Sequence, residues 1–161
     1  ITVEIGNTDA EGRLILADTL YYADSFKPEL IIDFATLTGA ARVALGPDLP
    51  AYFTHQEDIA LMLNNISITE KDPLWRLPLY QPYTSWLDSE VADTNNISHG
   101  PHAGSITAAL FLNKFIKTNT KWIHIDTYAW SDRNIPGHSK GGDIIGVRSV
   151  FKFIKNYINN L

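Results

Sequence analysis

Three charged side chains lie close together near the start of the chain. Asp9, Glu11 and Arg13 belong to the stretch 7–14, which reads Asn-Thr-Asp-Ala-Glu-Gly-Arg-Leu. Carboxylates are hard oxygen ligands, and two of them on one turn can bridge and hold two divalent cations, which in two-metal hydrolytic sites lie about 3.5–4 Å apart and activate a shared water. A guanidinium beside them would stabilise an anion or a developing oxyanion. The residue types and their spacing therefore indicate a two-metal hydrolytic site.

A simpler interpretation of the same stretch is the start of a helix. Residues 1–5 alternate as in a strand, and apolar residues at helical spacing follow the stretch. Thr8 and Glu11 have the spacing of a capping box. Gly12 costs about 1 kcal/mol of helix propensity relative to alanine, and Arg13 places a cation at the positive end of the helix dipole. Because such local conflicts concentrate at functional sites, the functional interpretation is favoured.

The remaining elements follow from apolar periodicity. The apolar run at 30–35 predicts a buried parallel strand, with the turn Thr36-Leu37-Thr38-Gly39 at its carboxyl end. The other expected elements are strands at 51–54 and 122–126 and helices at 40–45, 57–68, 106–116 and 147–158. This alternation predicts the α/β class, with a mainly parallel or mixed sheet between two layers of helices.

Composition and net charge limit the classes of function that this chain can have. The net charge is −5, which argues against nucleic acid as the main partner. The chain has no cysteine, which excludes a thiolate metal site and a cysteine nucleophile, and no apolar run is long enough to span a bilayer. An acidic balance is compatible with a divalent-cation site.

The stretch 7–14 resembles, letter for letter, the signature of the cytosol leucine aminopeptidase family. The resemblance extends over essentially the whole chain and is carried by further matches at 16–18, 22–23, 32–40, 92–93, 96–97, 103–112, 124–126 and 146–148.

This resemblance implies a two-metal aminopeptidase that removes N-terminal, leucine-like residues from peptides. Asp9 and Glu11 would ligate two divalent metals, zinc by family expectation or manganese, and Arg13 would be catalytic, holding an anion such as bicarbonate that relays the proton. The turn residues Thr36, Leu37 and Gly39 would bind substrate. The family further implies a cytoplasmic homo-oligomer, a hexamer.

Family members carry more chain upstream, including further metal-binding and catalytic residues. We therefore expect residues 1–161 to be the C-terminal part of a larger catalytic domain, weakly active or inactive alone. Two alternatives stay open. One is a non-catalytic binding or regulatory module that retains the fold, and the other is a two-metal phosphoesterase. Relatives often have small residues after Asp126, whereas this chain has Thr-Tyr-Ala-Trp at 127–130, which puts the fit of the first substrate pocket in question.

Other candidates receive structural interpretations. His99 and His102 flank a Gly-Pro pair that disfavours a helix, so a surface loop or an oligomer contact is favoured over a zinc site. His124 is expected to be a structural histidine, and Asp126 is a candidate to support the site, its role left open.

Two apolar groups are assigned to the core. Trp75, Tyr80 and Trp86 are expected to form a satellite core rather than a ligand wall. The apolar face of the last helix, made of Val147, Phe151, Ile154 and Ile158, is expected to pack on the sheet.

Overall fold

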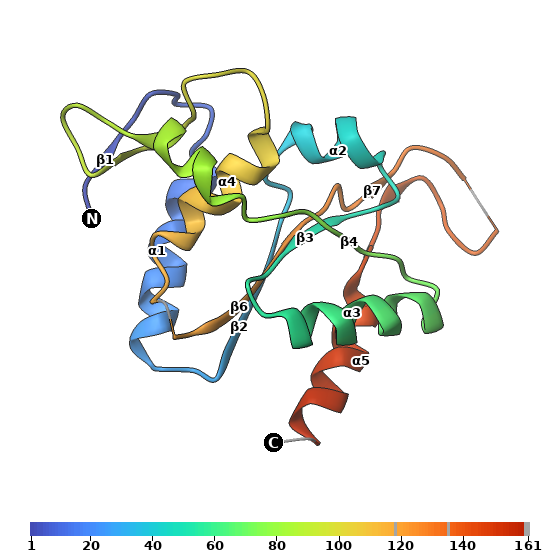
Figure 1. Ribbon diagram of the computed structural model, residues 1–161. Coiled ribbons are helices and arrows are strands. Elements are labelled where there is room, and N and C mark those ends of the chain that lie inside the picture. The colour runs from blue at the N-terminus through green and yellow to red at the C-terminus, as the bar shows by residue number, and fades with distance from the viewer. Residues whose placement is uncertain (118, 135, 160–161) are drawn as a thin grey trace.

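A computed structural model describes residues 1–117, 119–134 and 136–159. Its centre is a mixed four-stranded sheet in the order β2-β6-β3-β4 (Figure 1). The strands are β2 (Leu30–Ala35), β6 (Lys121–Asp126), β3 (Ala51–Phe53) and β4 (Trp75–Arg76). β2 runs parallel to β6, and β4 runs parallel to β3. The middle pair, β3 and β6, is antiparallel. The predicted α/β class with a mixed sheet is confirmed.

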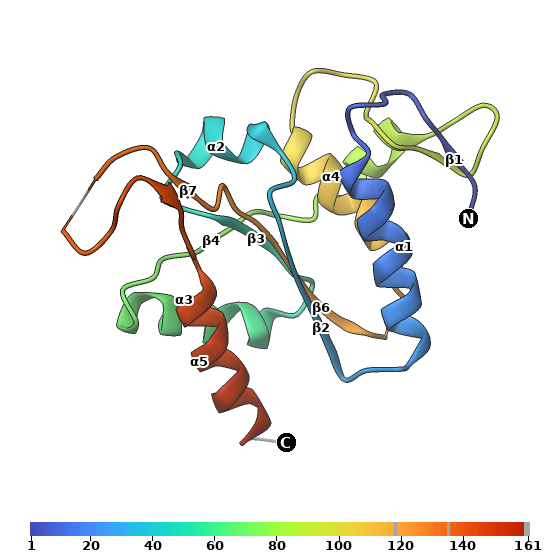
Figure 2. The same cartoon turned by 180° about the vertical axis from the view of Figure 1, so that it is seen from behind.

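Helices cover both faces of this sheet, which gives three layers (Figures 1 and 2). One layer contains α1 (Gly12–Ser25), α4 (Gly104–Asn113) and the 3-10 helix η1 (Gln81–Leu87), and the other contains α3 (Glu57–Thr69) and α5 (Val147–Ile158). The short helix α2 (Gly39–Leu45) lies beyond the carboxyl end of β2. Within the described ranges, no helix is both long and apolar enough to cross a bilayer.

The central strand β6 joins the two cores because its side chains alternate. Trp122 packs with α1 and α4, whereas Ile123 and Ile125 pack with α3 and α5. Helix α4 is buried on nearly every side, as its uniformly apolar sequence predicts, with Ala108 and Phe111 fully enclosed.

The first predicted strand differs from expectation. It is only two residues long, β1 (Val3–Glu4), and pairs with β5 (Thr94–Asn95) outside the central sheet. Ile1 and Ile5 are exposed, so the alternation at 1–5 does not mark a buried strand here. β2 was also expected to be buried, but it is an edge strand and only partly covered. A second small pair joins β7 (Trp130–Ser131) to β8 (Gly141–Gly142).

Helix α5 turns a different face to the core than expected. The face made of Val147, Phe151, Ile154 and Ile158 is exposed, Phe151 by 62%. Val150 and Phe153 are buried instead, in the core shared with α3. The helix has apolar side chains on two sides, and periodicity alone does not choose between them.

Part of the expected satellite core is present, because Tyr80 packs edge-on against Tyr83 with ring centroids 4.8 Å apart, and Tyr83 packs against the core under α1 and α4. Trp75 and Tyr80 are about half exposed, and Trp86 stacks on Tyr83 with ring centroids 3.9 Å apart. Trp75 lies on β4, which pairs with β3 at the sheet's edge and leaves the indole largely uncovered.

Candidate active site

The acidic turn before α1 is held in place by Asn96, which is fully buried. The Asn96 side-chain oxygen accepts hydrogen bonds from the backbone N–H groups of Gly6 and Asn7, at 2.9 and 3.2 Å, and its amide nitrogen donates to the Asn7 carbonyl at 2.8 Å. Sequence reasoning reached Asn96 only through the family resemblance, because the contact spans about ninety residues. This one side chain fixes the path of the chain into the turn.

The turn does not form the expected capping box. Glu11 is the N-cap residue of α1, has helical backbone angles and makes no side-chain capping hydrogen bond. The Asp9 backbone N–H is bound by the side chain of Asn7, at 2.8 Å. Asp9 and Glu11 are both exposed, and neither takes part in an ion pair within the described part of the chain. Helix capping therefore does not account for these two carboxylates.

Arg13 lies in the first turn of α1. It is half-buried, and its Nη1 donates to the Asn96 carbonyl at 2.7 Å. Burial lowers the pKa of the Arg13 guanidinium below its ordinary value, and the negative charge of Asp126 partly opposes this shift. The group stays charged at neutral pH. The cation at the positive end of the helix is thus stabilised by a carbonyl and a carboxylate from distant parts of the chain.

Asp126 organises the turn that follows β2. Its carboxylate accepts hydrogen bonds from the backbone N–H groups of Leu37 and Thr38, each at 3.1 Å, and from the hydroxyls of Thr38 and Ser105. The parallel register pairs Ala35 with Asp126, which brings the carboxyl ends of β2 and β6 to one edge. The side chain is only 2% exposed. Asp126 therefore sets the conformation of the turn, a role that the sequence left open.

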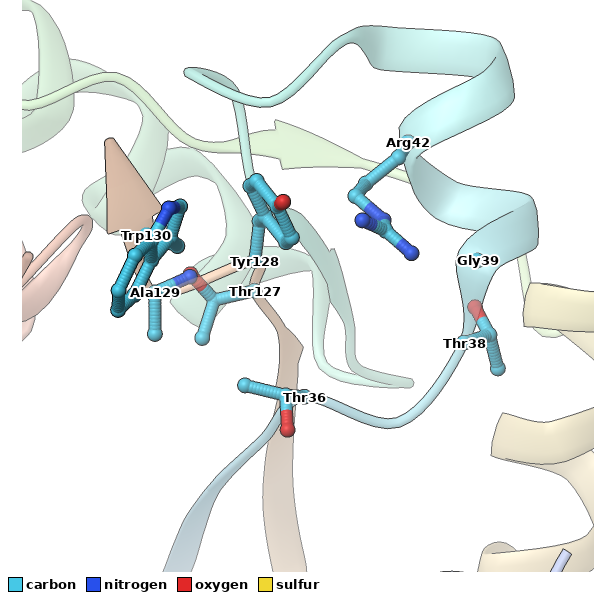
Figure 3. Close-up of a pocket in the computed structure, with 8 residues that line it drawn as sticks. All are labelled: Thr36, Thr38, Gly39, Arg42, Thr127, Tyr128, Ala129 and Trp130. Carbon is cyan, nitrogen blue, oxygen red and sulfur yellow. The ribbon is translucent and has the colours of Figure 1, made fainter. Parts of the chain in front are cut away.

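A pocket of about 440 Å³ opens at this edge (Figure 3). It is lined by Thr36, Thr38, Gly39, Arg42, Thr127, Tyr128, Ala129 and Trp130. Two of the expected substrate-binding residues, Thr36 and Gly39, are therefore in its wall. The third, Leu37, packs its side chain against the core under α1 and α4. Arg42 and Tyr128 are pocket residues that sequence reasoning did not assign, although the bulk at 127–130 pointed to this position.

His99 and His124 do not line this pocket. His99 is exposed and its Nε2 lies 2.9 Å from the Asp88 carbonyl. His124 is fully buried, with Nδ1 2.6 Å from the Asp33 carboxylate and its ring stacked near Phe53. Its Nε2 has no hydrogen-bond partner among the described residues. This geometry fits the expected structural role for one ring nitrogen of His124.

The acidic turn offers oxygen ligands of the kind that hard divalent cations prefer. These ligands fill only part of a coordination shell. Asp9 and Glu11 offer carboxylate oxygens that are not engaged by protein cations. Across the residues that the structure describes, no three His, Asp or Glu side chains gather into a metal-binding group. Two carboxylates could hold cations here only with ligands from elsewhere.

The fold is an α/β fold with a mixed sheet between two helical layers. At one edge of the sheet lie an acidic turn and a pocket, linked through Arg13 and Asp126, so this edge is a candidate hydrolytic site. The sequence profile of the cytosol aminopeptidase family, catalytic domain, matches residues 1–151. The chain belongs to this family.

Individual relatives agree with this assignment. The chain is 48% identical to a "Probable cytosol aminopeptidase" of Prochlorococcus marinus (strain MIT 9312) over 158 residues, which is 96% of this chain and 32% of the relative. Among solved structures, a cytosol aminopeptidase from Coxiella burnetii superposes with a TM-score of 0.92 and 52% identity, covering 96% of this chain and 34% of that one. A mutant of tomato leucine aminopeptidase gives a TM-score of 0.86 and 40% identity, covering 94% of this chain and 29% of that one. The chain thus spans about a third of the length of the relatives it matches.

Proposed function

We propose that residues 1–161 are the C-terminal part of the catalytic domain of a metal-dependent aminopeptidase, which removes leucine-like N-terminal residues from peptides. The observation that carries this proposal is the link between Arg13 and Asp126. Asp126 binds the Thr36–Gly39 turn directly, and its charge acts on the Arg13 guanidinium, where it opposes the lowering of the Arg13 pKa by burial. The charged turn and the candidate peptide pocket therefore belong to one edge of the sheet.

Asp9 and Glu11 would hold divalent cations, zinc or manganese. Such ions, when bound, supply Lewis-acid polarisation of a carbonyl and lower the pKa of bound water. The exposed carboxylates support this role because no protein cation competes for them in the described residues. The remaining ligands would come from the rest of the protein.

Arg13 would bind an anion beside these carboxylates. Among the described residues, a protein carbonyl engages only Nη1, which leaves other guanidinium N–H groups to hold an anion such as bicarbonate and to stabilise an anionic intermediate. Partial burial strengthens such an interaction because water screens it less. The backbone N–H groups of Leu37 and Thr38 are bound to Asp126, so that turn contacts substrate through its side chains and carbonyl oxygens.

The family also suggests where the whole protein works. The relatives' names contain the word cytosol, which supports a cytoplasmic location. A homo-hexamer follows from the family resemblance noted for the sequence. Peptides are the substrates that the aminopeptidase names support, and a net charge of −5 argues against nucleic acid as the partner.

The test is hydrolysis of leucyl-4-nitroanilide with zinc or manganese, by residues 1–161 and by a chain extended to the length of the relatives. The extended chain is expected to show turnover that a chelator abolishes, and the short chain little or none. Robust metal-dependent turnover by residues 1–161 alone would refute the need for further ligands. If the extended chain bound the substrate without metal and did not hydrolyse it, a non-catalytic binding module would be favoured.

A further inference from the structure

The pocket at the edge of the sheet contains a cation stacked on an aromatic ring. Arg42 reaches from α2 toward Tyr128, above the turn that carries Thr36 and Thr38 (Figure 3). The guanidinium carbon lies 4.2 Å from the centroid of the Tyr128 ring. The guanidinium carbon lies over the face of the ring, and a cation–π contact of this kind does not use up the N–H groups, which stay available for hydrogen bonds.

The charge of Arg42 is not balanced inside the pocket. None of the residues that line the pocket is acidic, and Arg42 takes part in none of the ion pairs found among the described residues. Asp126, a buried carboxylate at this edge, is occupied by four donors from Leu37, Thr38 and Ser105. The exposed Arg133, by contrast, pairs with Asp48.

A guanidinium fixed by stacking is suited to a planar, two-oxygen anion. Its parallel N–H groups match the geometry of a carboxylate, and the charged hydrogen bonds are about twice as strong as neutral ones. We propose that Arg42 and Tyr128 form a carboxylate-binding subsite of the peptide pocket. The inference rests on the proposed aminopeptidase function and adds a ligand chemistry to it.

A peptide can supply that carboxylate in two ways. It can be the side chain of an N-terminal glutamate or aspartate, or the terminal α-carboxylate of a short peptide such as a dipeptide. Both present the same two oxygens to Arg42. Tyr128 lines the pocket beside Arg42, so both residues of the subsite face the same space.

The experiment compares two substrate pairs in the chain extended to the relatives' length, with saturating manganese. Glutamyl-4-nitroanilide against leucyl-4-nitroanilide reports on a side-chain carboxylate. Leu-Gly against Leu-Gly-amide reports on a terminal carboxylate. For each pair, the readout is kcat/KM for the substrate with the carboxylate divided by kcat/KM for the neutral substrate. We expect Arg42→Gln to lower this ratio about tenfold in one of the two pairs. The affected pair identifies the source of the carboxylate.

Matched variants separate charge, stacking and general damage. Arg42→Lys should lower that ratio less than Arg42→Gln, because it keeps the charge but loses the planar fork. Tyr128→Phe should keep the ratio and Tyr128→Ala should lower it, because only the first retains the ring. Arg133→Gln is the control for loss of one positive charge and should leave both ratios unchanged.

The outcomes distinguish the subsite from the enzyme. If leucyl-4-nitroanilide is hydrolysed but Arg42→Gln leaves both ratios unchanged, the subsite is overturned and the aminopeptidase stands. If nothing is hydrolysed, the proposed function fails, and calorimetry with glutarate decides the subsite instead. Weaker glutarate binding by Arg42→Gln than by Arg133→Gln then supports it, and equal binding overturns it.

Discussion

Carboxylates at the same edge of the molecule have opposite environments. Asp126 is buried and accepts hydrogen bonds from four protein donors, whereas Asp9 and Glu11 are exposed and have no ion-pair partner in the described chain. A saturated carboxylate shapes the chain around it, and an unsaturated one can bind something else. The difference shows that residue type alone does not separate a structural acid from a candidate ligand.

The largest expected effect is on activity. Glu11→Gln in the extended enzyme should lower kcat/KM about 1000-fold, or about 4 kcal/mol, because an amide is a poor substitute for a metal-binding carboxylate. The free energy of unfolding should change by no more than about 0.5 kcal/mol, since the side chain is exposed. Asp18→Asn, an exposed change on the same helix, is the control and should affect neither. A large loss of stability in Glu11→Gln would show that the comparison with Asp126 is wrong.

Asp126→Asn should mainly lower the free energy of unfolding, unlike Glu11→Gln, which should mainly lower activity. Replacing the buried carboxylate leaves one of its oxygen positions with an N–H group that faces other donors, at a cost of about 3 kcal/mol in unfolding free energy. Urea unfolding followed by tryptophan fluorescence measures this cost. Stability equal to that of Asp18→Asn would remove Asp126 from its assigned role.

Arg13 follows Glu11 by two residues, and its charge interacts with that of Asp126. Arg13→Gln should lower kcat about 100-fold, or about 2.7 kcal/mol, if the guanidinium stabilises developing negative charge. Arg13→Lys retains charge without the planar fork and should recover part of that loss. Equal kcat for wild type and Arg13→Gln would limit this residue to its hydrogen bond with Asn96.

The smallest effect concerns Asp24, a second buried carboxylate with protein partners. Burial pushes its pKa up, but hydrogen bonds and charge from Thr120 and Lys117 outweigh burial and hold the pKa below the ordinary 3.8. A carboxyl with a depressed folded-state pKa stabilises the fold above its unfolded pKa and loses that contribution as pH falls through the folded pKa. Between pH 5 and 2, Lys117→Gln should therefore reduce the acid-induced loss of stability by about 1 kcal/mol or less. An unchanged pH profile of unfolding would contradict this.

Much of the fold follows from local pattern. The strands at 30–35, 51–53 and 121–126 and the helices at 57–69 and 104–113 lie within a few residues of their predicted positions, because each has a clear apolar period. The failures occur where burial depends on a partner. Within residues 1–5, only Val3 and Glu4 form a strand, which pairs with β5 outside the central sheet, and α5 buries Phe153 instead of Phe151.

By itself the sequence determined the α/β class, the family and the acidic signature of Asp9, Glu11 and Arg13, because these depend on residue types at short spacing. Only the tertiary structure decided what Asp126 and Asn96 do and that Arg42 stacks on Tyr128, because those contacts join residues about 85–90 positions apart. Whether a carboxylate has hydrogen-bond donors around it likewise depends on residues that folding brings close to it. The residues next to it in the sequence do not reveal which donors these are.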